Sequence, residues 1–479
     1  MNARIETNAL KNKKVIIAPY TKESFVYRNN IAAVGADVIG FLDNYKQNNE
    51  IINESPHVVN YDYIIIIPSK HKTEIANKFV DKGFNSDKIF FSPNIHSHHL
   101  VKYKKNNLFQ KTVKWFLDKL KSFICLLSKK ISFKRKYLYF AENFIDVNLL
   151  ESYKYHYACY KDEAILVIYN CKANQDSYFG CEKIKYVNNK LLLFYYFFFF
   201  HCLVIDHKVI NSVYHYFSGS KRIIQLWHGL PLKTLDGNIW SDDGIYEAFI
   251  SPSKWFNENI FKNLYNSKHF LNYGYPRNDI FFANSHMRNK KNNIGIKTIV
   301  YMPTYRDSGK NDYPLKYDEL NRFCKQNEID FILKLHPYVL TNFGVKNNSF
   351  FSNMIRYKKY SNIYLFPPFK NIYPLLTNTS ILITDYSSVY YDFLLKNNPI
   401  IFYLFDKEEY QKYRGGKFLV PIDEFTPGIK VNNFYNLLKA IEDALQQDDF
   451  KNERKMLTEK IGLNKSPAMP LILNFIRNV

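Results

Sequence analysis

The sequence lacks the cysteine spacing of a disulfide framework or of a structural zinc site. Its six cysteines form no CxxC pair and no dense pattern: Cys125, Cys159, Cys171, Cys181, Cys202 and Cys324. Small secreted domains pair many cysteines in a short chain, and zinc modules use closely spaced Cys or His ligands. A reduced, cytoplasmic protein is therefore expected.

The chain also lacks an apolar run long enough to cross a bilayer. A spanning helix needs ~20 apolar residues, whereas the longest block, residues 191–200 (LLLFYYFFFF), is much shorter. This block predicts a buried helix that leads into a strand at 202–205. The N-terminal segment MNARIETNALKNKK has no apolar stretch of the kind found in secretory signals.

Acidic residues are scarce relative to basic ones. The chain has 44 Asp and Glu against 66 Lys and Arg, which gives a formal net charge of +22. Such an excess suits nucleic acid, an anionic membrane surface or a phosphorylated substrate. The sequence contains no RNA-recognition signature, paired zinc ligands or basic zipper, so no nucleic-acid partner is expected.

Alternating strand and helix signals predict an α/β protein. Residues 1–101 predict a small Rossmann-like domain, but its first turn, Ala18-Pro19-Tyr20-Thr21, lacks the glycines that let a pyrophosphate approach the backbone. A structural or degenerate binding domain is the preferred interpretation. Residues 137–285 and 286–479 form two further α/β halves, and halves of similar size favour an active site in the cleft between them. Strands are expected at 137–140, 164–168, 202–205, 222–226 and 248–250 in the first half, and at 298–302, 331–335, 363–365, 381–383 and 400–402 in the second.

Residues 102–136 predict a basic amphipathic linker helix. The segment holds twelve Lys or Arg against one acid, Asp118. Its apolar residues recur at intervals of three and four, which is typical of an amphipathic helix. Such a helix suits an anionic bilayer surface, and it equally suits packing on a neighbouring domain with its lysines in solvent. The overall charge slightly favours the membrane.

A histidine follows an expected strand in each half. His228 (QLWHGLPLK) comes after 222–226, and His336 (KLHP) comes at the end of 331–335. Because ligands gather beyond the carboxyl ends of strands in open α/β sheets, both are predicted to face the cleft. A neutral histidine there can take a proton from an attacking hydroxyl. Either residue alone also fits a structural role. Lys334 alternates with His336 and is expected to point the same way.

Residues 381–402 predict a strand–turn–helix–strand unit with Ser387 and Ser388 at the start of the helix. Exposed N–H groups at a helix N-terminus suit a phosphate, while a serine there also serves as an ordinary cap. Arg306, after the strand at 298–302, suits a bidentate phosphate contact or an ion pair with a nearby carboxylate. Arg277 lies in a segment (GYPRND) that is expected to link the halves near the cleft.

Five motifs in this order resemble the CDP-glycerol glycerophosphotransferases of teichoic-acid and capsule synthesis: WHGLPLK, GYPRND, YMPTYRD, KLHP and ITDYSSVYYDF. The segments YRGG (413–416) and PIDE (421–424) also look like that family's C-terminal part. The resemblance covers about residues 137–450. Each motif alone is weak, but five in order are a specific signal. The family usually has Thr where Leu230 stands, which leaves the identity of donor or acceptor open.

The resemblance implies a GT-B-like fold, in which a pair of Rossmann-like domains faces a cleft, here preceded by the small domain and the basic helix. It implies an enzyme that is peripheral on the inner face of the cell membrane. Such an enzyme transfers a polyol phosphate, glycerol phosphate in the first place, from a CDP-linked donor to a membrane-linked or glycan acceptor and releases CMP. His228 becomes the candidate base and His336 a second essential histidine. Donor-binding candidates are Arg306, Lys334, Asp385, Ser387, Ser388 and Arg414, and further candidates are Lys233, Arg277 and Asp392.

Two other functions stay open from the sequence. One is a GT-B glycosyltransferase that uses a sugar nucleotide, and the other is a non-catalytic protein that binds a membrane surface through the basic helix. No carboxylate pair suited to a metal is evident, because Asp242 and Asp243 lie in a polar segment. Neither a metal nor a cofactor is therefore expected.

Overall fold

The computed structural model describes most of the chain. The residues outside the description are 1–3, 44–49, 53–55, 57–58, 70, 95–96, 98, 104–107, 132, 171–183, 210, 233–244, 284–295, 307–312, 337–338, 340–353, 368–369, 414–417 and 479. The chain divides into two compact units, 1–120 and 121–479, and each is described by itself.

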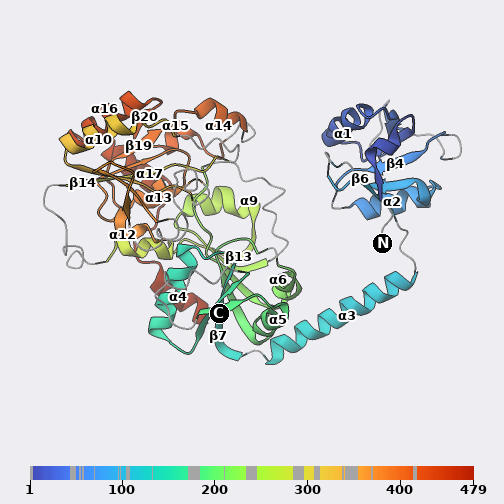
Figure 1. The fold of residues 1–479 in the computed structure, drawn as a ribbon. Coiled ribbons are helices and arrows are strands. Elements are labelled where there is room, and N and C mark those ends of the chain that lie inside the picture. The colour runs from blue at the N-terminus through green and yellow to red at the C-terminus, as the bar shows by residue number, and fades with distance from the viewer. Residues whose placement is uncertain are drawn as a thin grey trace. The chain divides into compact units, whose positions relative to one another are not determined.

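The first unit is a six-stranded sheet between two helices (Figure 1). Side chains alternate along each strand, so residues such as Val15 and Ile17 pack with α1, while Ile16 and Ala18 pack with α2. The order is β1-β6-β5-β4-β2-β3, parallel from β5 to β3, with β6 antiparallel to both β5 and β1. The elements are β1 (Arg4–Glu6), β2 (Lys14–Ala18), α1 (Lys22–Ala32), β3 (Asp37–Phe41), β4 (Tyr63–Ile66), α2 (Lys72–Asp81), β5 (Ile89–Phe91) and β6 (His99–Lys102).

The second unit begins within α3 (Leu108–Ile131) and contains two seven-stranded sheets. The first is parallel throughout, in the order β13-β12-β11-β10-β7-β8-β9. The chain starts at β7, builds outward to β9, and returns to add β10 to β13 on the other side. Its strands are β7 (Phe133–Glu142), β8 (Ala164–Tyr169), β9 (Ile184–Val187), β10 (Phe200–Ile205), β11 (Arg222–Gln225), β12 (Ile245–Ile250) and β13 (Asn266–Leu271).

The second sheet of this unit repeats the plan. Its order is β16-β17-β15-β14-β18-β19-β20, and all pairs are parallel except β16 with β17. The chain reverses its direction of growth between β14 and β18, just as it does between β7 and β10 in the first sheet. The strands are β14 (Lys297–Met302), β15 (Ile329–Leu333), β16 (Ile355–Arg356), β17 (Ile363–Leu365), β18 (Ile381–Thr384), β19 (Ile400–Tyr403) and β20 (Ile429–Val431).

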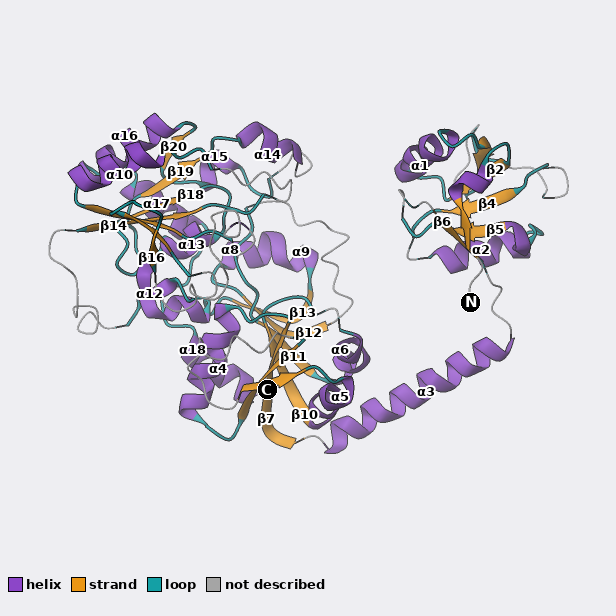
Figure 2. Cartoon of the chain, viewed as in Figure 1, coloured by secondary structure: helices purple, strands orange, loops and turns teal. Residues whose placement is uncertain are grey.

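Helices cover both faces of these sheets (Figure 2). On the first sheet, α5 and α6 pack on one face, and α4 and α18 on the other. The C-terminal helix α18 thus returns to the first sheet, although residues 286–479 were expected to form the second half. The helices named here and below are α4 (Val147–Cys159), α5 (Lys190–Phe199), α6 (Ser212–Phe217), α10 (Tyr317–Gln326), α12 (Tyr373–Leu376), α13 (Val389–Phe393), α14 (Lys407–Tyr413), α16 (Phe434–Gln446), α17 (Lys451–Lys460) and α18 (Met469–Asn478).

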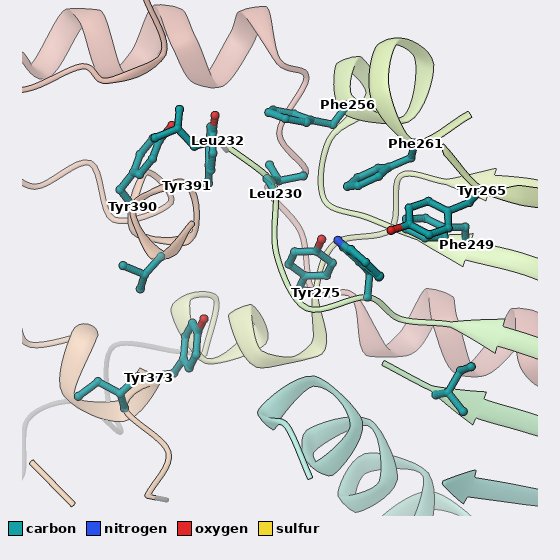
Figure 3. Close-up of a cluster of buried hydrophobic side chains, with 14 of the residues drawn as sticks. Leu230, Leu232, Phe249, Phe256, Phe261, Tyr265, Tyr275, Tyr373, Tyr390 and Tyr391 are labelled. Carbon is teal, nitrogen blue, oxygen red and sulfur yellow. The ribbon is translucent and has the colours of Figure 1, made fainter. Parts of the chain in front are cut away.

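One hydrophobic core joins the two sheets of the second unit. Leu230 and Leu232, which follow β11, lie between Tyr390 and Tyr391 of α13 and the aromatic side chains beside β12 (Figure 3). Leu230 is almost fully buried there. Leu230 therefore packs the junction between the two sheets.

The predicted α/β class is confirmed, with parallel pairs predominating in all three sheets. Every expected strand is present at least in part. Within the segment 102–136, where a basic helix was expected, α3 covers Leu108–Ile131, whereas Lys102 ends β6 and β7 begins at Phe133. The interpretation of 191–200 as a buried helix is only half right. The helix α5 leads into β10 as predicted, but Leu191 at its start is 81% exposed.

Candidate functional site

A cavity of about 470 Å³ lies at the carboxyl ends of strands from both sheets of the second unit. It lies beyond the ends of β14 and β18, where the second sheet reverses its direction of growth and where open α/β sheets bind ligands. Its volume falls within the range of roughly 300–1,000 Å³ that is usual for ligand pockets. The lining residues are Trp227, His228, Gly229, Leu230, Pro231, Leu232, Met302, Pro303, Thr304, Tyr305, Lys334, Leu335, His336, Tyr386, Ser387 and Ser388.

The residue before His228 has a left-handed backbone conformation that sets the direction of the His228 turn. Trp227 has φ = +56°, a conformation that costs a non-glycine residue about 1–3 kcal/mol and clusters at functional sites. The Trp227 carbonyl accepts a hydrogen bond from Asn148 Nδ2 at 2.8 Å, and its N–H donates to Gln225 Oε1 at 2.9 Å. Asn148 and Gln225 are both fully buried, so the turn that carries His228 is held from two sides.

The His228 imidazole is held in its neutral form. Its Nδ1 lies 3.2 Å from the Asp206 carbonyl oxygen, which can only accept, so Nδ1 carries the proton and Nε2 is the basic nitrogen. Burial, and next the neighbouring His207, lower the His228 pKa to about 3. A neutral imidazole with a basic Nε2 is the form that a general base requires.

Gly229 brings the His228 turn against the Ser387–Ser388 turn. A Cβ atom at position 229 would lie 2.6 Å from Ser388 Oγ and 3.6 Å from Arg277 Nη2. A side chain there would force Ser388 to shift, and Gly229 has φ = +156°, a backbone conformation that other residues rarely adopt, so both features favour glycine. The structure thus brings His228 and the serine pair together at one cavity.

The serine pair does not act as an ordinary helix cap through Ser388. The helix α13 has only five residues, and the Ser388 side chain makes no capping hydrogen bond. Ser387 Oγ instead accepts a long bond from the Val389 N–H at 3.5 Å. Both serines are partly exposed and line the cavity. Because α13 is so short, hydroxyl and N–H groups matter more here than a helix dipole.

Lys334 and His336 reach the same cavity from the second sheet. The strand β15 ends at Leu333, so both residues follow the strand rather than belong to it. Lys334 Nζ donates to the Pro367 carbonyl at 3.0 Å, and burial lowers its pKa to about 7. His336 is exposed, with its ring 4.7 Å from the Tyr305 ring.

Arg306 and Asp385 stand behind the cavity, and its described lining includes neither. Arg306 pairs with Asp406 through Nε (2.6 Å) and Nη2 (3.0 Å), and with Asp385 at 2.8 Å. Asp385 also accepts from the Thr304 N–H and hydroxyl at 2.8 and 2.6 Å. Of the two roles that the sequence left open for Arg306, the ion pair is the one observed. These contacts fix the Thr304 turn, which lines the cavity.

Arg277 and Asp392 form a buried pair that reaches His228. Arg277 Nη2 lies 2.7 Å from Asp392 Oδ2, and the two side chains are 6% and 2% exposed. Asp392 also accepts from Asn278 Nδ2 at 2.9 Å and from the Tyr373 hydroxyl at 2.7 Å. Arg277 Nη1 donates to the His228 carbonyl at 2.8 Å. The pair thus ties the His228 turn to α13.

Asp206 and His207 are residues that the sequence reasoning missed. They directly follow β10, and the His207 ring stacks on His228 with centroids 4.3 Å apart and an interplanar angle of 7°. The signal that found His228 and His336, a histidine just after a strand, was present at His207 as well. Lys233 and Arg414, predicted as site residues, lie outside the described residues. Within the described part of the chain no group of three or more His, Cys, Asp or Glu side chains could hold a metal ion.

Comparison with known proteins gives a family match. Residues 111–461 match the family described as CDP-Glycerol:Poly(glycerophosphate) glycerophosphotransferase. Among curated relatives, the chain is 31% identical over 251 residues to a teichoic acid poly(glycerol phosphate) polymerase of Bacillus spizizenii, covering 46% of this chain and 60% of the relative. It is 30% identical over 196 residues to the teichoic acid ribitol-phosphate polymerase TarL of Staphylococcus aureus, covering 38% of this chain and 32% of the relative.

The chain thus spans less than two thirds of the length of these relatives. Among solved structures, that of the wall teichoic acid polymerase TagF is similar, with a TM-score of 0.57 and 19% identity. The similar region covers 78% of this chain and 98% of the TagF chain. At this identity the likeness concerns the fold.

Proposed function

The chain belongs to the CDP-glycerol:poly(glycerophosphate) glycerophosphotransferase family, and from this premise we propose that it transfers a polyol phosphate from a CDP-linked donor to an acceptor hydroxyl. Glycerol phosphate is the first candidate for the transferred group, and CMP is the leaving product. The acceptor is a membrane-linked or glycan chain, and the product is a teichoic-acid-like or capsular surface polymer.

The observation that carries the proposal is the composition of the cavity. A neutral histidine, two serine hydroxyls, a lysine and a second histidine line one space of ligand size. They come from the ends of strands in both sheets, as expected for a site that brings a donor and an acceptor together. Holding two reactants in a reactive orientation can contribute ~7–11 kcal/mol to catalysis.

His228 acts as the general base in this mechanism. The acceptor hydroxyl oxygen attacks the β-phosphorus of the donor and gives its proton to His228 Nε2. The bond between that phosphorus and the bridging oxygen breaks, and the electron pair leaves with CMP. A positioned base of this kind contributes typically 10²–10⁴-fold to the rate.

The serine pair and Lys334 hold the donor diphosphate. The two hydroxyls donate to phosphate oxygens, and Lys334 supplies positive charge when an anion binds beside it. Donors directed at the charge that develops in the transition state usually provide the largest electrostatic contribution. His336, at the exposed side of the cavity, lies near the transferred phosphate. Four residues outside the cavity lining hold these groups in place: Arg306, Asp385, Arg277 and Asp392. Lys233 and Arg414 remain candidates for donor contact.

The architecture assigned to this function is a GT-B-like pair of Rossmann-like domains. We assign the acceptor side to 137–285 together with α18, which packs on the first sheet, and the donor side to the rest of 286–479, with 1–101 as an accessory domain and 102–136 as a linker. Two observations support this assignment. In each sheet the order in which the chain adds strands reverses at the centre, and both sheets contribute residues to the same cavity.

The helix α3 is the proposed membrane contact. Ser128 Oγ donates to the Phe198 carbonyl at 2.9 Å, and Cys125 Sγ donates to that of Tyr216 at 3.5 Å, so one side of α3 packs on α5 and α6. Elsewhere α3 exposes large apolar side chains, among them Trp115 and Phe123 at 61% and 62%. No helix within the described residues is long and apolar enough to cross a bilayer. Apolar exposure next to lysines suits the surface of an anionic bilayer.

A vesicle experiment tests this membrane contact. The full chain should co-sediment with vesicles that contain phosphatidylglycerol, and Phe123→Glu should weaken that binding several-fold. Substitution of Tyr435, which is exposed on α16, by Glu serves as the control. Equal binding of the two variants would reject α3 as the contact.

Donor specificity tests the proposed reaction. The purified chain is incubated with CDP-glycerol, CDP-ribitol, a UDP-sugar and a GDP-sugar together with a membrane acceptor fraction, and the released nucleotide is separated by chromatography. The proposal expects CMP from a CDP-polyol. Release of UDP or GDP alone would instead make the chain a glycosyltransferase, and no release from any donor would favour a binding protein.

A further inference from the structure

The reversal point of the first sheet holds a cluster of charged residues that the proposed mechanism does not use. The strands β7 and β10 are neighbours at that point, and the carboxyl end of an open sheet forms a crevice there. Asp206 and His207 come directly after β10, and Asp146 precedes α4 shortly after β7. The His228 turn comes from the next strand, β11, so this cluster lies beside the candidate base.

Asp206 orients two imidazole rings at once. Its Oδ1 lies 2.9 Å from His207 Nδ1, and its Oδ2 accepts from the Leu149 N–H of α4 at 3.1 Å. Its main-chain carbonyl accepts from His228 Nδ1 at 3.2 Å. Asp206 is only 3% exposed, so one buried residue holds both rings in place. Their parallel stack at 4.3 Å follows from this arrangement.

The charges around the stack favour a proton on His207 and oppose one on His228. Burial works against a charge on His207, but the carboxylates of Asp206 and Asp146 outweigh it and raise the His207 pKa. For His228, burial and the adjacent His207 lower the pKa, Arg277 lowers it further, and Asp146 and the Asp206 carbonyl oppose them. Asp392 is linked to the cluster through its pair with Arg277.

We propose that His207 is a positioning residue for the base His228. Held by Asp206, the His207 ring fixes the plane of the His228 imidazole and directs Nε2 toward the cavity. As a cation stacked on that ring, it keeps Nε2 unprotonated until the acceptor hydroxyl delivers its proton. This inference rests on the proposed role of His228 as the base.

The surroundings of His207 allow the charge and the stacking to be separated by substitution. Its side chain is 33% exposed, and Phe144 packs edge-on against it with centroids 4.9 Å apart. His207→Phe keeps an aromatic ring in the stack and removes the charge. His207→Gln keeps a hydrogen-bond donor toward Asp206 and removes both ring and charge. His215→Gln, at an exposed histidine of α6, is the matched control.

Histidine NMR measures the proposed effect without turnover. The full chain carries ring-labelled histidine, and His228→Gln identifies the His228 signals. In a titration from pH 8 down to about pH 4, wild-type His228 should remain the neutral Nδ1–H tautomer, while His207 titrates above the usual histidine range. Loss of a charge at this distance should raise the His228 pKa by about one unit or more in both His207 variants.

The pH profile of CMP release provides the second readout. In both variants the acidic limb of kcat/KM should move to higher pH by about the same amount, and His207→Phe should retain more activity at high pH than His207→Gln. If the acidic limb of kcat/KM did not move and activity fell evenly at all pH values, His207 would have only a packing role and the proposal would be overturned. A wild-type His228 that titrates in the usual histidine range would overturn it as well. Absence of wild-type activity would instead reject the proposed function, because the NMR titration does not depend on it.

Discussion

Replacing Asp392 with alanine should destabilise the protein and, at the same time, displace the proposed base His228. The Asp392 carboxylate accepts hydrogen bonds from Arg277, Asn278 and Tyr373. The substitution leaves the Arg277 guanidinium, which is 6% exposed, without its nearest counter-charge. Its other carboxylate neighbour, Asp146, lies 4.0 Å away. Removing one partner of a buried ion pair costs about 3–5 kcal/mol.

The effect on activity follows from the second contact of Arg277. Its Nη1 donates to the His228 carbonyl at 2.8 Å, so a guanidinium that moves to find solvent or another partner displaces the His228 turn. A misplacement of about 1 Å in a catalytic group can cost roughly 10²-fold in rate. CMP release should therefore fall by about that factor even where the variant remains folded.

Urea denaturation followed by tryptophan fluorescence measures the stability of Asp392→Ala, and CMP chromatography measures its activity. Tyr373→Phe is the matched control, because it removes one neutral donor to the same carboxylate and should cost only ~1 kcal/mol. If Asp392→Ala unfolded at the same urea concentration as Tyr373→Phe and released CMP at the wild-type rate, the coupling of this pair to His228 would be refuted.

Three further changes give distinct expected results. Gly229→Ala places a Cβ 2.6 Å from Ser388 Oγ and should lower CMP release at least tenfold, but it should cause a much smaller loss when added to Ser388→Gly; an equal tenfold loss in that background would mean that this contact is not the cause. The pKa of Lys334 is lowered to about 7 by burial, so the free enzyme loses this charge as pH rises through 7. KM for the donor should then rise above pH 7, and Lys334→Met should flatten that dependence, whereas an unchanged profile would exclude Lys334 from donor binding. Activity should persist after dialysis against EDTA, and loss that Mg²⁺ restores would show that the enzyme requires a metal.

The core of the fold was predictable because parallel strands buried on both faces are continuous apolar runs. Segments such as YIIII at 63–67 and ILI at 381–383 predict strands without ambiguity. The strands that went unpredicted lie mostly at sheet edges, where burial does not impose such a pattern. In the edge strand β13, Asn266–Leu271 (NSKHFL), every residue is exposed or half-buried, and β20, also at an edge, has three residues.

The cavity residues were predictable to the extent that they follow strands. His228, Ser387 and Ser388 each lie just past a strand end, and the parallel sheets bring such ends together. The partners of the charged residues could not be predicted in the same way, because they come from distant parts of the chain. Arg306 takes Asp406 as its partner, and nothing near Arg306 in the sequence indicates that pair. His207 shows the strand-end signal, but its stacking on His228 depends on how β10 and β11 pair.

The measurement that tests the central claim most directly is CMP release from CDP-glycerol by the wild-type chain and by His228→Ala under single-turnover conditions. Donor binding is measured in parallel by calorimetry, so that a loss of chemistry is distinguished from a loss of affinity. If His228 is the base, the variant should bind the donor with similar affinity and release CMP at least 10²-fold more slowly. Release at the wild-type rate by His228→Ala would contradict the proposed reaction mechanism.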